Sequence, residues 1–232
     1  MEPREQTPTD PREPARPAGA LAELAGDPST RSRFLRMAGG AAVATSLSAL
    51  IAACGKDDTP GNGLGGAGVA AERFGQGDAG IVGYALYLEL LEVAFYDQAV
   101  KSGKLTGRAL ELAKRFGEEE RAHADTLSGT LKSLGGKPPP GAKFAFPTSD
   151  PQELLLTAAQ VESLGAGAYL GQVGRIQSKQ VLAAALSIHT VEARHAAALA
   201  QLLGRPITPD GSFGAPATSI DVLQQTRSFV TV

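Results

Sequence analysis

The sequence has no tryptophan, a single cysteine, three histidines and few aromatic side chains. One cysteine rules out a disulfide bridge within the chain. With so few aromatic residues, a hydrophobic core must be built mainly from Ala, Leu, Val and Ile. Such a composition favours packed helices.

A net positive charge is also missing. The 22 Lys and Arg residues are outnumbered by 24 Asp and Glu residues, which gives a formal net charge of −2. The chain therefore lacks the basic field that attracts nucleic acid, and we expect no nucleic-acid partner. The 28 Gly and 15 Pro residues gather in the first 80 residues and in a few short connections.

The first part of the chain does not have the composition of a folded domain. Residues 1–30 are rich in Pro, charged and small residues, so we expect a disordered extension, or a translation start assigned too far upstream. Residues 31–54 are typical of a targeting segment, because Arg31, Arg33 and Arg36 precede an apolar run over residues 37–53. That run is short and contains Gly, Ser and Thr, which disfavours a stable membrane-spanning helix.

The apolar run ends in Ile51-Ala52-Ala53-Cys54, which resembles a bacterial lipobox with Ile51 in place of the usual Leu. We therefore expect lipidation of Cys54 and a membrane-anchored lipoprotein on the outer face of the cytoplasmic membrane or in the periplasm. Residues 30–36 resemble a twin-arginine export signal, but Ser32 stands where the second arginine belongs. Export by the folded-protein route and export by the unfolded-chain route both remain open. The alternative is a plain membrane anchor with an incidental cysteine. Residues 55–77 are Gly-rich and polar, as in a flexible tether.

Helical periodicity begins at about residue 78 and defines the folded domain, residues 78–204. We predict an all-α four-helix bundle with a long connection between its second and third helices. Asp150 and Pro151 provide an N-cap and a first helical residue for the third helix. Residues 205–232 form a tail whose packing the sequence does not predict. The expected helices cover about residues 79–101, 107–134, 151–173 and 179–203.

Two Glu-x-x-His motifs occupy matching places, Glu120 with His123 on the second helix and Glu192 with His195 on the fourth. Residues three apart lie on one face of a helix, so each pair can bind one metal ion from the same side. One such motif arises easily by chance in a charged helix. Two motifs that use two of three histidines are much stronger evidence.

The helices that precede these motifs carry a second repeated pattern. Glu89 is followed seven residues later by Tyr96, and Glu162 is followed seven residues later by Tyr169. The chain thus repeats a hairpin that pairs a Glu and Tyr helix with a Glu-x-x-His helix. Two facing hairpins would bring four carboxylates and two imidazoles to one interior point.

We predict that this interior point binds two divalent metal ions. Apolar neighbours indicate that the four glutamates point inward, and burying one unpaired carboxylate costs several kcal/mol. Glu92, Tyr96, Tyr169 and His189 are alternatives or outer partners: Glu92 competes with Glu89, the tyrosines can orient ligand carboxylates, and His189 is more typical of a hydrogen-bonded core residue. An accidental buried polar network remains the other interpretation. The predicted ligands are Glu89, Glu120, His123, Glu162, Glu192 and His195.

These residues make the chain resemble the ferritin-like superfamily, and within it the exported bacterial ferritin-like proteins that include the desiccation-related group. The resemblance rests on residues 88–96, the Glu120-Arg121-Ala122-His123 motif and their matches in the second half, and it covers residues 78–204. It implies a carboxylate-bridged pair of iron or manganese ions that reacts with oxygen, peroxide or ferrous ion, in oxidative or desiccation stress.

Two other functions stay open at this point. One is a metal-binding or stress-protective surface module without turnover, and the other is a purely structural bundle that binds a surface partner. The oligomeric state is open too, and a homodimer is compatible with such a domain.

Overall fold

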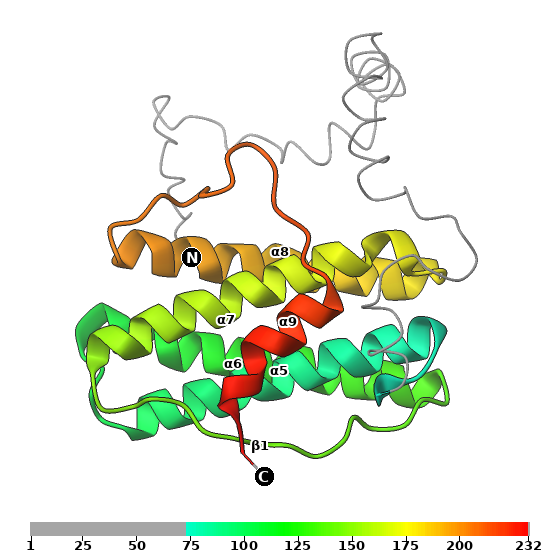
Figure 1. Ribbon diagram of the computed structural model, residues 1–232, viewed down its shortest axis with the longest axis horizontal. Helices are drawn as coiled ribbons and strands as arrows, with labels where there is room; N and C mark the ends of the chain where they lie inside the picture. The colour runs from blue at the N-terminus through cyan, green and yellow to red at the C-terminus, as the bar shows by residue number, and fades with distance from the viewer. Residues whose placement is uncertain (1–72, 232) are drawn as a thin grey trace, which may run out of the picture. The chain divides into compact units, whose positions relative to one another are not determined.

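The computed structural model describes residues 73–231, and the predictions for residues 1–72, including the one for Cys54, lie outside this range. The described part contains four long helices whose bounds differ from the predicted ones by at most two residues. The prediction of an all-α bundle with a long second connection is confirmed (Figure 1). These helices are α5 (Gly77–Lys101), α6 (Gly107–Ser133), α7 (Pro151–Gln172) and α8 (Lys179–Leu202).

Local sequence signals explain where the helices begin and end. The Asp150 carboxylate accepts hydrogen bonds from the backbone N–H groups of Gln152 and Glu153 at 2.6 and 3.3 Å, and Pro151 opens α7. Helix α8 is capped by Ser178. Gly204 follows α8 with a φ of 67°, a left-handed conformation that terminates helices and favours glycine.

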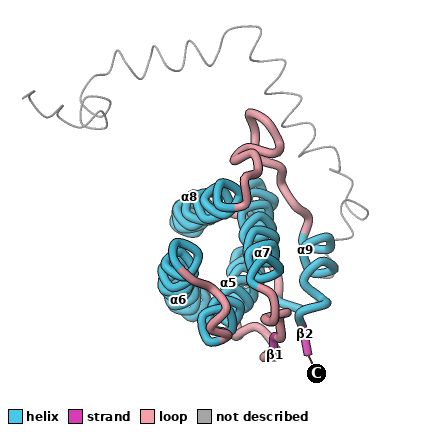
Figure 2. The backbone as a smooth tube through the Cα atoms, turned by 90° about the vertical axis from the view of Figure 1, so that its left-hand side faces the viewer, coloured by secondary structure: helices cyan, strands magenta, loops and turns pink. Residues whose placement is uncertain are grey.

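The bundle consists of two hairpins, α5–α6 and α7–α8, packed so that α5 lies beside α7 and α6 beside α8 (Figure 2). One apolar cluster, around Phe95, Phe116 and Leu154, fills one end. Another, around Leu86 and Leu127, fills the other end. The four predicted ligand glutamates lie on their helices between these clusters, so apolar side chains seal the middle of the bundle on both sides.

The C-terminal segment, residues 205–231, folds onto the bundle in a way that the sequence did not predict. It contains α9 (Ser219–Thr226), a short 3₁₀ turn η2 (Arg227–Phe229) and β2 (Val230–Thr231). Strand β2 pairs antiparallel with β1 (Lys143–Phe144) from the long connection. Another 3₁₀ turn, η1 (Val173–Arg175), ends the α7 region. Figure 2 shows α9 on the outer side of α7.

Helix α5 is long and apolar enough to cross a membrane by composition, but two thirds of its most apolar window is buried within the bundle. Two fully or almost fully buried glutamates, Glu89 and Glu92, also lie along it. Charged side chains are strongly disfavoured against lipid. Helix α5 is therefore a largely buried helix of the bundle.

Candidate metal centre

Each of the four long helices contributes one glutamate to the middle of the bundle. Glu89, Glu120, Glu162 and Glu192 are each 0% exposed. In the described part of the chain no lysine or arginine is buried, so no basic side chain neutralises these carboxylates from within the core. Isolated ionised carboxylates are not tolerated in such surroundings without protons or cations.

The first group of ligand atoms surrounds His123. Its Nδ1 atom lies 3.4 Å from a Glu89 oxygen, 2.9 Å from a Glu120 oxygen and 3.1 Å from a Glu192 oxygen. Ligand atoms of these four residues all lie within 4.8 Å of one another. One nitrogen and three carboxylate oxygens at this spacing can hold a divalent cation.

The second group surrounds His195. Its Nδ1 atom lies 2.9 Å from a Glu120 oxygen and 3.3 Å from a Glu162 oxygen. With Glu192 these residues form another set of four whose ligand atoms lie within 4.8 Å of one another. Glu120 and Glu192 belong to both groups, so the two groups overlap as the ligand shells of two neighbouring ions do.

The unsatisfied atoms in this cluster support cation binding. In the described part of the chain, the His195 Nδ1 atom and the facing Glu120 Oε1 atom are 2.9 Å apart, yet neither has a partner with hydrogen-bond geometry. Both carboxylate oxygens of Glu192 also lack a partner there. Buried polar atoms in folded proteins almost always have partners. The residues therefore fit bound metal cations.

Two tyrosines hold carboxylates across the bundle. The Tyr96 hydroxyl on α5 donates to Glu162 on α7, and the Tyr169 hydroxyl on α7 donates to Glu89 on α5. Burial, together with the neighbouring Glu162 and Glu89 charges, raises the pKa of both hydroxyls, so each remains a proton donor. The two tyrosines thus fix the orientation of the two carboxylates that are not shared.

Charges within the cluster divide between the acids and the imidazoles. Burial raises the pKa of Glu89 to about 8 and raises that of Glu192 well above its usual range. For Glu120 burial acts in the same direction, but the close imidazole nitrogens of His123 and His195 outweigh it and lower the pKa to about 2. The close contacts of the imidazoles with Glu120 and the neighbouring carboxylates likewise overcome burial and raise the pKa of His123 to about 12 and of His195 to about 10.

Glu92 is buried beside the centre without joining either ligand group. It is 2% exposed, and burial followed by the charge of Glu192 raises its pKa well above the usual range. A side chain at Gly165 would place its Cβ 2.7 Å from a Glu92 oxygen, so the glycine makes room for this fifth carboxylate. His189 lies apart from both groups, with its Nδ1 atom 3.1 Å from the carbonyl oxygen of Ala166.

Sequence reasoning missed two residues that contact His195. The Glu119 carboxylate lies 2.7 Å from the His195 Nε2 atom, and the Phe116 ring stacks on the imidazole with centroids 3.9 Å apart. In the second repeat the place of Glu119 is taken by Val191. A search for repeated residues therefore could not find Glu119, and only the cross-bundle contact reveals it.

These contacts make the two halves of the centre unequal. His195 is 3% exposed and has Glu119 on its outer nitrogen, whereas the His123 side chain is 13% exposed. A carboxylate on the outer nitrogen fixes the ring and raises its basicity as a ligand. The group around His195 is therefore the more rigid one.

Comparison with known proteins locates the domain within the chain. A model of the ferritin-like domain family matches residues 77–205, which is more than half of the chain and includes all six predicted ligands. Among solved structures, the chain is similar to a conserved hypothetical protein from Mycobacterium tuberculosis, with 20% sequence identity and a TM-score of 0.48. That similarity covers 55% of this chain and 90% of the other. No curated protein matches the chain.

Proposed function

The chain belongs to the ferritin-like domain family, and from this premise we propose that its bundle binds two divalent ions, iron or manganese, and reacts with oxygen, peroxide or ferrous ion. The observation that carries the proposal is the sharing of Glu120 and Glu192 between the groups around His123 and His195. Four carboxylates balance the charge of two divalent ions.

The chain's own residues would prepare this centre for chemistry. The two metal ions, when bound, would supply the electron exchange with the oxidant or with ferrous ion. Tyr96 and Tyr169 hold the carboxylates of Glu162 and Glu89 in place through their hydroxyl donors. The apolar clusters at both ends of the bundle limit water around the ligands. Four protein ligands at each metal position would leave coordination sites of a six-coordinate ion open for a small molecule.

Elemental analysis combined with oxidant consumption tests the proposal. We expect folded protein to bind about two iron or manganese ions, and to consume oxygen or peroxide in a metal-dependent way. Glu120→Ala removes a carboxylate shared by both groups and should abolish metal binding at both. Glu111→Ala, which removes an exposed glutamate from the same helix, is the matched control and should change neither measurement.

The outcomes separate the candidate functions. Bound metal without consumption of oxygen, peroxide or ferrous ion would select a metal-binding or stress-protective module instead of an oxidoreductase. Protein without metal, and unchanged in behaviour by Glu120→Ala, would reject both and leave a structural bundle.

We further propose that the domain is exported, carries a lipid on Cys54, and acts at the outer face of the cytoplasmic membrane or in the periplasm in oxidative or desiccation stress. The lipobox-like residues 51–54 and the preceding basic and apolar segment support this. When bacteria that produce the protein are fed a fatty-acid analogue, the chain should carry the label. Cys54→Ser should abolish this labelling and the recovery of the protein in the membrane fraction. A labelled Cys54→Ser variant would contradict the proposal.

A further inference from the structure

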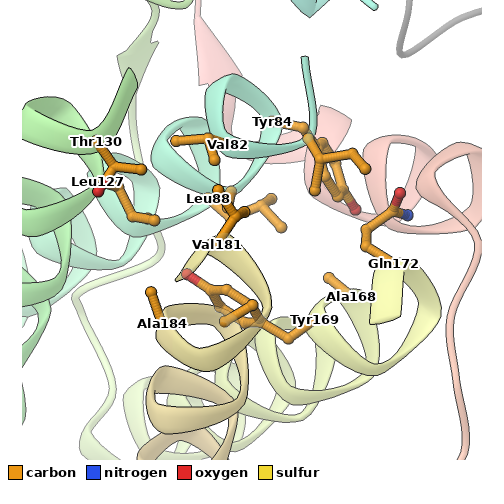
Figure 3. Close-up of a pocket in the computed structure, with 13 residues that line it drawn as sticks. Val82, Tyr84, Leu88, Leu127, Thr130, Ala168, Tyr169, Gln172, Val181 and Ala184 are labelled. Carbon is orange, nitrogen blue, oxygen red and sulfur yellow. The ribbon is translucent and has the colours of Figure 1, made fainter. Parts of the chain in front are cut away.

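A narrow apolar chamber lies between the four long helices at the end of the bundle where α7 meets α8 (Figure 3). Apolar side chains from each of these helices line it, among them Val82, Leu88, Leu127 and Val181. Small alanine side chains, including Ala184, leave the space between them. Apolar walls favour an apolar occupant. The transfer of an apolar molecule from water into such a space is favourable, whereas a polar molecule would lose its hydrogen bonds to water.

The size of the chamber restricts what it can hold. Counted with its opening it encloses about 420 Å³, but only about 20 Å³ of this is wide enough for the centre of a water molecule. Space on this scale accommodates one molecule of two or three atoms. The chamber therefore suits a very small apolar molecule unless its walls move.

The chamber borders the candidate metal centre through Tyr169. Tyr169 forms part of the chamber wall, and its hydroxyl donates to Glu89. Leu88, another wall residue, directly precedes Glu89 in α5. A molecule in the chamber would thus be separated from a metal-ligand carboxylate by a single side chain.

One polar group in the chamber wall has no partner. Tyr84 is 2% exposed, and within the described residues its hydroxyl has no hydrogen-bond partner. Figure 3 shows this hydroxyl at the side of the chamber near Gln172. A weak hydrogen-bond acceptor in the chamber could therefore use a donor that is already buried.

The tyrosine related to Tyr169 by the internal repeat borders a space of opposite character. Tyr96 lines a cleft whose other walls include Lys114, Glu118 and Arg121, and about 140 Å³ of that cleft is wide enough for the centre of a water molecule. Such a charged, roomy cleft suits water and polar solutes, including hydrogen peroxide. The two halves of the centre are therefore approached through different surroundings.

We propose that the apolar chamber is a binding site for dioxygen and its route to the centre past Tyr169. The proposal rests on the proposed function for its reaction, while the binding site itself is independent of bound metal. It separates dioxygen, which uses the apolar chamber, from hydrogen peroxide, which does not need it.

Xenon, an apolar atom, tests the site in the metal-free protein. We expect xenon to bind in the chamber, detected by ¹²⁹Xe NMR and by shifts of the methyl signals of Val82 and Val181. Ala184→Leu should abolish this binding because the larger side chain fills the half-buried edge of the space. Ala183→Leu adds the same atoms at the exposed neighbouring position and should bind xenon like the original protein.

Oxidant rates test the route in the metal-loaded protein. With ferrous ion as reductant, Ala184→Leu should lower the rate of oxygen consumption several-fold and leave the rate of hydrogen peroxide consumption unchanged. Ala183→Leu should change neither rate. Ala184→Val, which fills less of the chamber, is measured alongside in case the leucine disturbs folding. It should lower the rate of oxygen consumption by an intermediate amount.

The outcomes distinguish this proposal from the proposed function. Absence of xenon from the original protein, or an oxygen rate unaffected by Ala184→Leu and Ala184→Val, would overturn the chamber as the dioxygen site. A protein that binds two ions but consumes no oxidant would reject the redox function, and the xenon result alone would then decide whether the chamber binds small apolar molecules.

Discussion

Binding of divalent ions to the metal-free protein at neutral pH should release about three protons, one each from Glu89, His123 and His195. Burial raises the pKa of Glu89 to about 8, so this carboxyl retains its proton at neutral pH. Carboxylate neighbours raise the pKa of both histidines far above neutral, so each imidazole carries a proton too. A metal ion needs the ionised carboxylate and the free imidazole nitrogen, so these protons must leave. Glu162 and Glu192, whose pKa values are also raised, can only increase the number.

Isothermal titration calorimetry with Mn²⁺ in buffers of different ionisation enthalpy measures this number directly. The observed enthalpy should vary with the ionisation enthalpy of the buffer with a slope of about three or more protons. Glu89→Gln carries no titratable proton at that position and should lower the slope by about one if the ion still binds. Glu111→Ala should leave the slope unchanged. Tight binding with a slope near zero would refute the reasoning, because the cluster would then already be ionised without metal.

The same protons predict how the stability of the metal-free protein depends on pH. Glu89 binds its proton more tightly in the folded state, with a pKa of about 8 against an ordinary 4.5, so its contribution is complete below about pH 4.5 and is lost as the pH rises to 8. This difference corresponds to about 5 kcal/mol. The raised pKa values of His123 and His195 also lower the stability of the folded state as the pH rises above their ordinary pKa of 6.5. In the presence of a chelator, urea unfolding should therefore show a stability that falls from about pH 5 to 8; a rising stability would contradict the assignment.

Three substitutions, one of them with a compensating change, test the surroundings of the centre and the docked C-terminal segment. Glu119→Gln keeps the size of the side chain but weakens the contact with His195, and metal titration should show an affinity lower by about ten- to hundredfold with unchanged helix content. Gly165→Ala places a methyl group against the Glu92 carboxylate and should destabilise the fold by about 1–3 kcal/mol in denaturant unfolding, an effect that Glu92→Ala should largely relieve. Gly171→Ala would collide with the backbone of the C-terminal segment, so limited proteolysis of that segment should accelerate while the bundle keeps its helix content; equal proteolysis would contradict the packing.

Local signals explain why the helices could be predicted from the sequence. Asp150 and Pro151 mark the start of α7 because capping and proline geometry depend only on neighbouring residues. The Glu-x-x-His motifs, and the tyrosines that follow Glu89 and Glu162, are recognisable because the two hairpins repeat the same pattern. Helical periodicity then placed Glu120 and Glu192 on the inner faces, where the structure also has them.

The features that the sequence did not reveal depend on contacts between distant residues or on departures from the repeat. Glu119 contacts a histidine 76 residues away, and the second hairpin has no equivalent. Glu92 is accommodated by Gly165 from another helix, a relationship invisible in either segment alone. The C-terminal segment is polar and Pro-rich before α9, and its docking depends on the fit of its backbone against Gly171.

That docked segment also sets the practical limits of the folding unit. The family match stops at residue 205, but Val222 in α9 is 0% exposed and packs in one cluster with Phe74, Tyr84 and Tyr87. A fragment trimmed to the match would bare this aromatic strip to water, and exposed strips of this kind promote self-association. Recombinant protein for metal and gas measurements should therefore extend through residue 231, because the self-association of a shorter fragment would distort those measurements.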